Sequence, residues 1–339
     1  MDDEGPWRER YSRQIALATV GEEGQRRLGA ATVAVVGAGA LGTNSVELLV
    51  RAGVGTVRVI DRDVVERSNL HRMRVLGDAD VGRSKAEALA TALASLLPGS
   101  RVEAVAEDLT AANALALLDG ADLVLDAVDN MATRYLVNDA CLEAGVPWIY
   151  GGVVGTSGLL APFPAGGPCL RCLFPEPPAP GALPTCESAG IHPSAPAVVA
   201  SVQVAMATRM LLGVLGTPRM VAVDLWSDEW RTVDLMRNDD CPACSGGARE
   251  FLSMEAAGTV EPLCGQDAVQ INPQRPATID LDAKEREWRR LGHVTRRGPV
   301  LSLELDSIRL QLFASGRALV KGTSEVAVAK TVYARYVGE

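Results

Sequence analysis

The feature that most constrains the fold is a short apolar run that ends in a glycine-rich turn. Residues 32–37 read TVAVVG, the turn continues as G-A-G-A-L-G over 37–42, and a helical stretch follows. A continuous apolar run of this length is typical of a strand buried on both faces. The alternation recurs, with strand-like runs at 57–60, 101–105, 121–128 and 146–150 and helical segments at 85–97, 111–118 and 134–144. The sequence therefore predicts an α/β fold, a mostly parallel sheet with helices on both faces.

The rest of the chain predicts two further regions. An amphipathic helical lead-in at 7–30 precedes the first strand, and residues 151–194 are rich in glycine and proline and predict turns. The later segments predict a long apolar helix at 197–214, paired strands at 219–235, a helix at 280–291, strands at 299–304, 308–313 and 317–321, and a closing helix at 324–336. We expect a main domain over residues 1–250 and a small α+β module over 260–339.

Charge and composition exclude several classes of function. The chain of 339 residues has 33 Lys and Arg against 42 Asp and Glu, a net charge of −9, and this argues against a nucleic-acid-binding protein, which needs a basic face. No apolar run approaches the roughly 20 residues that span a bilayer. The acidic start MDDEGPWRER is unlike a secretory signal. We expect a cytoplasmic protein without nucleic-acid or membrane partners.

The glycine turn predicts a nucleotide site. Gly37, Gly39 and Gly42 satisfy G-x-G-x-x-G between a strand and a helix, where the backbone comes close to a phosphate and the helix N-terminus presents its N–H groups. Asp61 ends the next strand, where an acid accepts hydrogen bonds from ribose hydroxyls. This Rossmann-like arrangement predicts a nucleotide but does not separate NAD, FAD and ATP.

Cations beyond Asp61 favour a triphosphate over a dinucleotide. Arg72 lies in a polar loop and Lys85 at the start of a helix, and both can balance phosphate charge. Asp129 and Asn130 follow the strand predicted at 121–128, and a carboxylate there can hold Mg²⁺ against phosphate oxygens. Two plainer alternatives stay open, because Lys85 also fits a solvated helix start and Asp129 also fits a helix N-cap.

Four of the seven cysteines predict a metal site. Cys169 with Cys172, and Cys241 with Cys244, form two C-x-x-C pairs, and four thiolates make a closed, structural Zn²⁺ site. The alternative is two unrelated redox or free pairs. Cys186 lies in a proline-rich loop without a C-x-x-C partner, with His192 downstream as an exposed histidine or an assisting one. The role of Cys264 stays open.

Several motifs occur together and in order. They are R-Y-S-R-Q at 10–14, the glycine turn, D-x-D-x-V-x-x-S-N-L-x-R at 61–72, G-x-S-K at 82–85, D-x-x-D-N-x-x-x-R at 126–134 and the two C-x-x-C pairs. With these motifs the chain resembles the ThiF/MoeB/HesA family, relatives of the ubiquitin-activating enzymes, over about residues 7–247. Residues 262–339 are similar to the C-terminal extension of longer ThiF-type proteins.

The resemblance implies an adenylyltransferase (a nucleotidyltransferase). Such an enzyme uses ATP and Mg²⁺ to adenylate the C-terminal Gly-Gly carboxylate of a ubiquitin-like sulfur-carrier protein of the ThiS/MoaD type and releases pyrophosphate. It also implies a homodimer in which Arg13 reaches the partner subunit's phosphates, zinc at the four cysteines, Mg²⁺ at Asp129, and carrier or sulfur linkage at Cys186. The implied nucleotide-binding residues are Gly37, Gly39, Ala40, Gly42, Asp61, Ser68, Asn69, Leu70, His71, Arg72, Lys85, Asp129 and Asn130.

The chain departs from the family pattern at two positions and leaves other points open. Ala40 stands where a second glycine is usual, and Met73 stands where a glutamine is common. No H-C-x-x-G-x-R loop is present, so a sulfurtransferase is expected only as a separate partner. Three points stay open. The first is the pathway (thiamine, molybdopterin or tRNA thiolation), and the second is covalent linkage at Cys186. The third is the role of the tail, which is a docking or dimer-shaping module or a passive cap.

Two other functions compete with this one. A NAD- or FAD-dependent oxidoreductase uses the same glycine turn, but it leaves Arg72, Lys85 and the four-cysteine set unexplained. The other alternative is a non-catalytic scaffold with a degenerate site. The polar residues of the candidate nucleotide site, Asp61 and Asp129 included, are all present, and this argues against such a scaffold.

Overall fold

A computed structural model of the chain describes residues 4–97, 99–178, 189–253, 260–263, 267–273 and 279–338. The chain forms two compact units. The first comprises Met1–Arg62, Glu66–Ala79 and Lys85–Met254, and the second comprises Asp63–Val65, Asp80–Ser84 and Glu255–Glu339. The nucleotide motifs of the sequence therefore fall mainly in the first unit.

The first unit is built on an eight-stranded sheet with the order β3-β2-β1-β4-β5-β6-β7-β8. The strands from β3 to β5 are parallel, and β6 to β8 continue the sheet antiparallel. Their bounds are β1 (Thr32–Val36), β2 (Thr56–Ile60), β3 (Arg101–Val105), β4 (Leu123–Asp126), β5 (Trp148–Val154), β6 (Ser157–Phe163), β7 (Arg219–Asp224) and β8 (Glu229–Asp234). The predicted mostly parallel, Rossmann-like sheet is confirmed.

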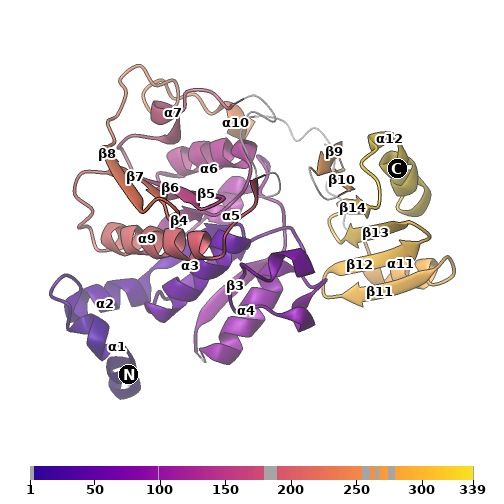
Figure 1. Cartoon of the computed structure of the whole chain (residues 1–339), viewed down its shortest axis with the longest axis horizontal. Helices are drawn as coiled ribbons and strands as arrows, with labels where there is room; N and C mark the ends of the chain where they lie inside the picture. Colours follow the sequence, from indigo (N-terminus) through magenta and orange to yellow (C-terminus); the bar gives the residue numbers. More distant parts are fainter. Residues whose placement is uncertain are drawn as a thin grey trace. The chain divides into compact units, whose positions relative to one another are not determined.

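Helices cover both faces of this sheet (Figure 1). One face carries α3 (Ala40–Arg51), α4 (Lys85–Leu96) and α9 (Ser194–Leu211), and the other carries α5 (Ala114–Leu118) and α6 (Met131–Ala144). The remaining helices are α1 (Glu4–Ile15), α2 (Gly21–Ala30), α7 (Leu170–Leu173) and α10 (Glu250–Ser253), with short 3-10 turns at Arg67–Asn69 and Asp78–Asp80.

The strand residues divide between the two faces, as the pleat of a strand requires. On β1, Val33 and Val35 join the core under α3 and α9, while Ala34 and Val36 join the core under α6. All four are at most 2% exposed. Full burial of such a valine contributes roughly 1.5–3 kcal/mol, so both faces of the central strands stabilise the fold. This explains why the run is apolar without alternation.

Two expectations from the sequence need correction. The helical lead-in at 7–30 is not one helix but two, because the chain turns between Ile15 and Gly21. The region 151–194 is not only turns, because Ser157–Phe163 forms strand β6. Its hydrogen bonds to β5 on one side and β7 on the other impose the strand despite a glycine and a proline in the segment.

The second unit is built on a six-stranded antiparallel sheet with the order β11-β12-β13-β14-β10-β9. Trp288 is fully buried in its core. Residues 63–65 belong to this unit, since Val64 is buried with Val300 and Phe313. The element bounds are β9 (Val260–Leu263), β10 (Ala268–Ile271), α11 (Leu281–Trp288), β11 (His293–Arg297), β12 (Val300–Leu305), β13 (Ile308–Phe313), β14 (Ala318–Lys321) and α12 (Val326–Tyr336).

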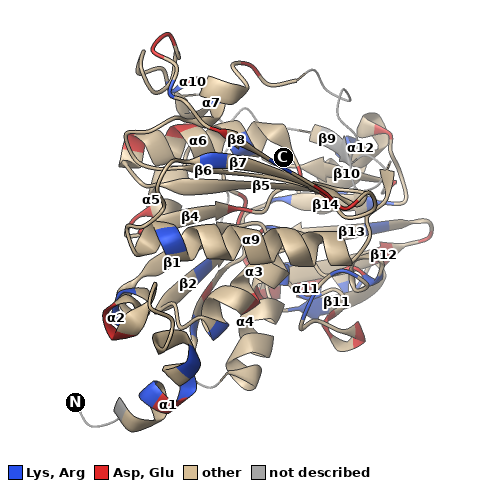
Figure 2. Ribbon diagram, turned by 60° about the vertical axis from the view of Figure 1, so that its left-hand side comes forward, with Lys and Arg blue, Asp and Glu red and all other residues tan. Residues whose placement is uncertain are grey.

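Charge is unevenly distributed over the helices of the first unit. Figure 2 shows α9 almost entirely uncharged, since Arg209 is its only charged residue, whereas α1 and α2 carry both signs. Glu22 of α2 pairs with Arg8 and Arg26. In the part of the chain that the structure describes, no helix, α9 included, is both long and apolar enough to cross a membrane.

Candidate active site and metal centre

The glycine turn is shaped by two close backbone approaches. Gly37 has φ +100°, and a Cβ at this position would lie 2.6 Å from the carbonyl oxygen of Ala127. A Cβ on Gly42 would lie 1.9 Å from the carbonyl oxygen of Gly37. α3 begins at Ala40, and its N-cap residue is Gly39, which has no side chain to cap the N–H groups of the first turn. The turn therefore leads directly into a helix N-terminus suited to an anion.

Substitution of Gly42 and substitution of Gly39 are expected to affect stability differently. Gly42→Ala forces the turn apart, and we expect a loss of about 1–3 kcal/mol of unfolding free energy together with the loss of ATP binding. Gly39→Ala meets no atom within 4 Å, so this variant is expected to fold normally and to lose only nucleotide affinity. Chemical unfolding and an ATP titration of both variants check this. Equal unfolding midpoints for the two variants would contradict it.

Asp61 lies directly beside the turn. Its Oδ2 accepts a hydrogen bond of 2.6 Å from the backbone N–H of Ala38, and its own N–H donates to the carbonyl of Val105. β2, β1 and β4 are neighbours in the sheet, so the residues that follow them meet at one edge. The structure thus brings together Asp61, the turn and the end of β4, as the sequence predicted.

Asn130, not Asp129, caps α6. The Asn130 side chain accepts a hydrogen bond of 2.9 Å from the N–H of Thr133. Asp129 is exposed at the carboxyl end of β4. The N-cap alternative for Asp129 is therefore wrong, because Asn130 makes that cap. Asn130, which the family resemblance places at the nucleotide, has at least this structural role.

A buried ion pair fixes the backbone that leads to Asp129. Nε of Arg134 lies 3.0 Å from Oδ2 of Asp126, and these side chains are 9% and 0% exposed. Arg134 also donates to the carbonyls of Val128 and Gly151, at 2.7 and 3.0 Å. Burial raises the pKa of the Asp126 carboxyl, and the guanidinium of Arg134 opposes that rise. The network ties the end of β4 to the middle of β5.

Removing one member of this pair has a large expected cost. Asp126→Ala leaves the guanidinium of Arg134 buried without its carboxylate, and we expect a loss of about 3–5 kcal/mol of unfolding free energy. Asp234→Ala is the matched control, because it breaks an exposed pair with Arg219 and is expected to cost at most about 1 kcal/mol. Urea unfolding of both variants measures the difference, and equal losses would contradict the account.

Gln203 is a buried amide that sequence analysis missed. Its Nε2 donates to the carbonyl of Asp126 at 2.8 Å, and its Oε1 accepts from Ser45 at 2.9 Å. The residue is fully buried on α9, which therefore bonds to both α3 and the end of β4. A lone amide within a mostly apolar helix was the available signal, because a buried amide needs hydrogen-bond partners.

The loop from Ser68 to Arg72 is hydrogen-bonded to itself. Nη1 of Arg72 donates to the carbonyl of Ser68 at 2.8 Å, and Nδ1 of His71 lies 3.1 Å from the same oxygen. The carbonyl of Asn69 accepts from the N–H groups of Arg72 and Met73. Met73, where the family commonly has a glutamine, is 5% exposed and anchors the loop by burial. Leu70 follows the 3-10 turn at Arg67–Asn69.

Lys85 and Arg13 lie on helices of the first unit. Lys85 is half-buried as the first residue of α4, and Arg13 is exposed in the last turn of α1. α1 is held by Gln14, whose Nε2 donates to Gln25 at 2.7 Å and to the carbonyl of Ala52 at 2.8 Å. The contacts of the described residues do not join Arg13 to the glycine turn, and its predicted reach to a partner subunit stays a prediction.

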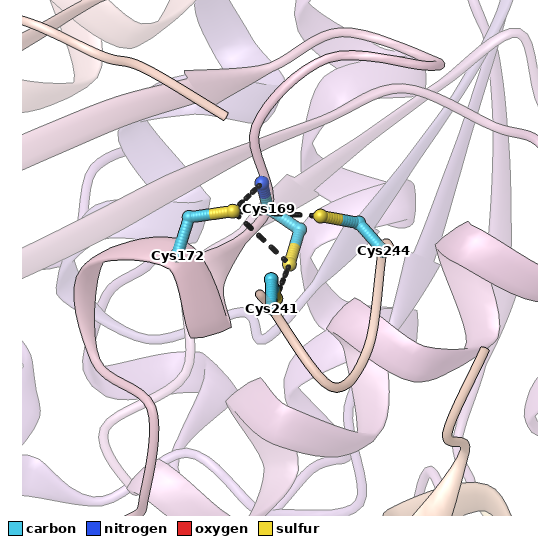
Figure 3. Close-up of side chains that lie close together, drawn as sticks. All are labelled: Cys169, Cys172, Cys241 and Cys244. Atoms are coloured by element: carbon cyan, nitrogen blue, oxygen red, sulfur yellow. Dashed lines mark hydrogen bonds between the residues drawn. The ribbon is translucent and has the colours of Figure 1, made fainter. Parts of the chain in front are cut away.

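The four paired cysteines converge (Figure 3). The sulfur of Cys169 lies 3.6 Å from that of Cys241 and 4.0 Å from that of Cys172, and the sulfurs of Cys172 and Cys244 are 3.4 Å apart. All four sulfurs lie within 4.8 Å of one another. Tetrahedral zinc with bonds of about 2.3 Å places sulfurs about 3.8 Å apart, so the cluster fits zinc and does not consist of separate pairs.

Burial and hydrogen bonds shift the pKa values of the cluster's thiols in different directions. Burial raises the pKa of the Cys169 thiol, and the sulfur of Cys172 raises it further. Burial and the hydrogen bond to Cys172 likewise raise the pKa of Cys244. Burial acts to raise the pKa of Cys241 too, but hydrogen bonds from the N–H groups of Cys244 and Ala243 and from the Cys169 and Cys244 side chains together lower it. A divalent cation at the centre would stabilise all four as thiolates.

Two cysteines from the sequence analysis, Cys186 and Cys264, lie outside the described residues. His192, which was a candidate assistant of Cys186, is exposed. Its Nδ1 lies 2.7 Å from Oγ of Ser194 at the start of α9. The structure thus gives His192 a local contact and leaves the predicted role of Cys186 as a prediction.

Comparisons with known proteins agree with these features. The model of the ThiF family matches residues 11–243. A sulfur carrier protein ThiS adenylyltransferase of Bacillus subtilis (strain 168) is 40% identical over 335 residues, covering 97% of this chain and 99% of its own length. A sulfur carrier protein adenylyltransferase of Thermus thermophilus is 45% identical over 259 residues, covering 73% of this chain and 95% of its own length.

Solved structures agree on the fold. A crystal structure of E. coli MccB with ATP superimposes with a TM-score of 0.58 at 22% identity, covering 69% of this chain and 74% of that one. At this identity the likeness shows the arrangement of helices and strands alone. The family match over residues 11–243 and the relatives at 40–45% identity go further, and they show that the chain belongs to the ThiF family.

Proposed function

We propose that this chain uses ATP to adenylate the C-terminal carboxylate of a ubiquitin-like sulfur-carrier protein and releases pyrophosphate. The observation that carries the proposal is the meeting of the glycine turn, Asp61 and the end of β4 at one sheet edge, in a ThiF-family chain. The relatives named as sulfur carrier protein adenylyltransferases support it. None of the relatives compared above bears an oxidoreductase name, so nothing favours the NAD- or FAD-dependent alternative.

The residues have distinct roles in this proposal. The N-terminus of helix α3 at Ala40 receives phosphate. Gly37 and Gly39 precede this helix, and Gly42 lies in its first turn. Asp61 accepts hydrogen bonds from the ribose. Asn69, Arg72 and Lys85 contact the triphosphate, and Ser68, Leu70 and His71 shape the loop. Asn130 holds the start of α6 beside them.

The chemistry needs position and charge rather than a protein nucleophile. A carboxylate oxygen of the carrier attacks the α-phosphorus, the bond to the β-phosphate oxygen breaks, and pyrophosphate leaves. Arg72 and Lys85 balance the charge on the leaving group. Mg²⁺ supplies further neutralisation when it is bound, and the exposed carboxylate of Asp129 is the oxygen ligand that we assign to it.

Three further elements belong to the proposal. We propose that the four cysteines bind structural Zn²⁺ and that the protein is a homodimer in which Arg13 reaches the partner subunit's site. We also propose that Cys186 takes part in sulfur or carrier transfer, and that any sulfurtransferase is a separate protein. The cytoplasmic location expected from the sequence also remains a proposal. A ThiS-type carrier of thiamine synthesis is favoured, because the Bacillus subtilis relative is similar over the second unit as well as the first.

A nucleotide panel and an adenylate assay test the function. We expect ATP with Mg²⁺ to raise the thermal midpoint of the protein, while NAD and FAD leave it unchanged. Incubation with ATP, Mg²⁺ and a carrier ending in Gly-Gly should then add the mass of one adenylyl group to the carrier. Stabilisation by NAD or FAD, with no adenylate formed, would support the oxidoreductase instead.

A further inference from the structure

A buried carboxylate on α3 binds two arginines of different origin. Glu47 is 2% exposed. Its Oε1 lies 2.8 Å from Nε of Arg51, one turn further along the same helix. Its Oε2 lies 2.7 Å from Nε of Arg74, which belongs to the segment after the candidate phosphate loop. Each arginine is about half exposed, at 46% and 54%.

The second arginine connects two parts of the candidate site. Arg51 already neutralises the charge of Glu47 from within the same helix, because the two residues are at the i,i+4 spacing that brings side chains together. Arg74 adds a link between helix α3, whose first turn follows the glycine turn, and the chain two residues beyond Arg72. Within the described part of the chain Oε2 of Glu47 accepts no hydrogen bond, so Arg74 is held by the attraction of opposite charges, which solvent ions screen little because the carboxylate is buried.

The backbone next to Arg74 supports a held conformation. Val75 has φ +60°, in the left-handed region that β-branched residues rarely adopt. Met73 and Leu76, which flank Arg74 and Val75, are buried, at 5% and 9% exposure, and Val75 itself packs against the core under α3. Such a conformation persists only where surrounding contacts impose it, and it is commonly found beside functional sites.

We propose that Glu47 and Arg74 form a positioning pair, which holds the loop of Asn69 and Arg72 in place relative to the glycine turn. The inference rests on the proposed function, in which these loop residues contact the triphosphate. In this proposal neither member of the pair contacts the nucleotide. Their effect passes through the backbone from Met73 to Leu76, and it fixes where the guanidinium of Arg72 meets the phosphates.

A comparison of the two arginines tests this pair. Arg74→Ala and Arg51→Ala each remove one half-exposed cation from the same carboxylate, so a purely structural role predicts the same effect from both. We expect Arg74→Ala to lower kcat/KM for ATP in carrier-dependent pyrophosphate exchange about 10-fold or more, and Arg51→Ala to change it less than about 2-fold. Thermal midpoints of both variants are measured alongside. Arg74→Lys is expected to recover part of the loss.

Arg72→Ala separates this inference from the function on which it rests. If Arg72→Ala loses activity while Arg74→Ala and Arg51→Ala behave alike, the positioning pair is wrong and the proposed function stands. If Arg72→Ala keeps the activity of the unmodified protein, the loop does not contact the triphosphate, and the positioning role is wrong with it. Loss in Arg72→Ala and Arg74→Ala together, with Arg51→Ala near the unmodified protein, supports the pair.

Discussion

Asp129→Ala is expected to lower ATP–pyrophosphate exchange on the order of 10³-fold, while the folded protein remains intact. The carboxylate is exposed at the end of β4, and the cap of α6 is made by Asn130, so its removal leaves that cap in place. It takes away the oxygen ligand proposed for Mg²⁺, and thereby charge stabilisation in the transition state, where one well-placed group contributes about 10²–10³-fold.

A Mg²⁺ titration makes this prediction specific. Exchange by the unmodified protein should saturate with Mg²⁺, whereas exchange by Asp129→Ala should stay low and need far more metal. Asp119→Ala is the matched control, since this exposed aspartate precedes β4 and so lies near the opposite end of that strand. The same Mg²⁺ response in Asp129→Ala and the unmodified protein would contradict the assignment.

Removal of the metal from the four-cysteine cluster is the second large effect. Cys241→Ser deletes one of four sulfurs that lie within 4.8 Å of one another. Structural zinc sites contribute about 10–16 kcal/mol in small peptides, and even a loss of several kcal/mol lowers the thermal midpoint of a domain of this size by about 10 °C or more. We therefore expect a zinc content near one per chain to fall to near zero, together with that loss of stability.

Cys141→Ala is the control for this experiment. Cys141 is 1% exposed in the core under α6 and is not part of the cluster. The substitution is expected to leave the zinc content unchanged and to lower stability only modestly. Elemental analysis and thermal unfolding of both variants decide the point. Zinc-free protein with full stability would show that the cluster is not a structural metal site.

The sequence predicted those parts of the fold that depend on local pattern. The apolar runs at 57–60 and 101–105 correspond to β2 and β3, and the helix predicted from residue 85 begins at Lys85. Strand β6 was missed because its sequence contains Gly158 and Pro162. Pairing with the preceding strand β5 and with the distant strand β7 holds that segment in the sheet, and the distant partner cannot be read from the local sequence.

The candidate site was predictable in its motifs and not in its supports. The glycine turn and Asp61 follow strands, so their meeting at one edge follows from a parallel sheet. Glu47 and Arg74 look like surface charges in the sequence, and only the packing of α3 shows that the carboxylate is buried. Likewise, Asp129 and Asn130 are adjacent and both suit an N-cap, and the backbone conformation at Asn130 selects it.

ATP–pyrophosphate exchange with a purified carrier tests the central claim most directly. The claim is that the glycine turn, Asp61 and Asp129 activate the terminal carboxylate of a sulfur carrier. We predict Mg²⁺-dependent exchange with a carrier that ends in Gly-Gly, and none with the same carrier lacking those two residues. Equal exchange with both carriers, or no exchange with either, would contradict the claim.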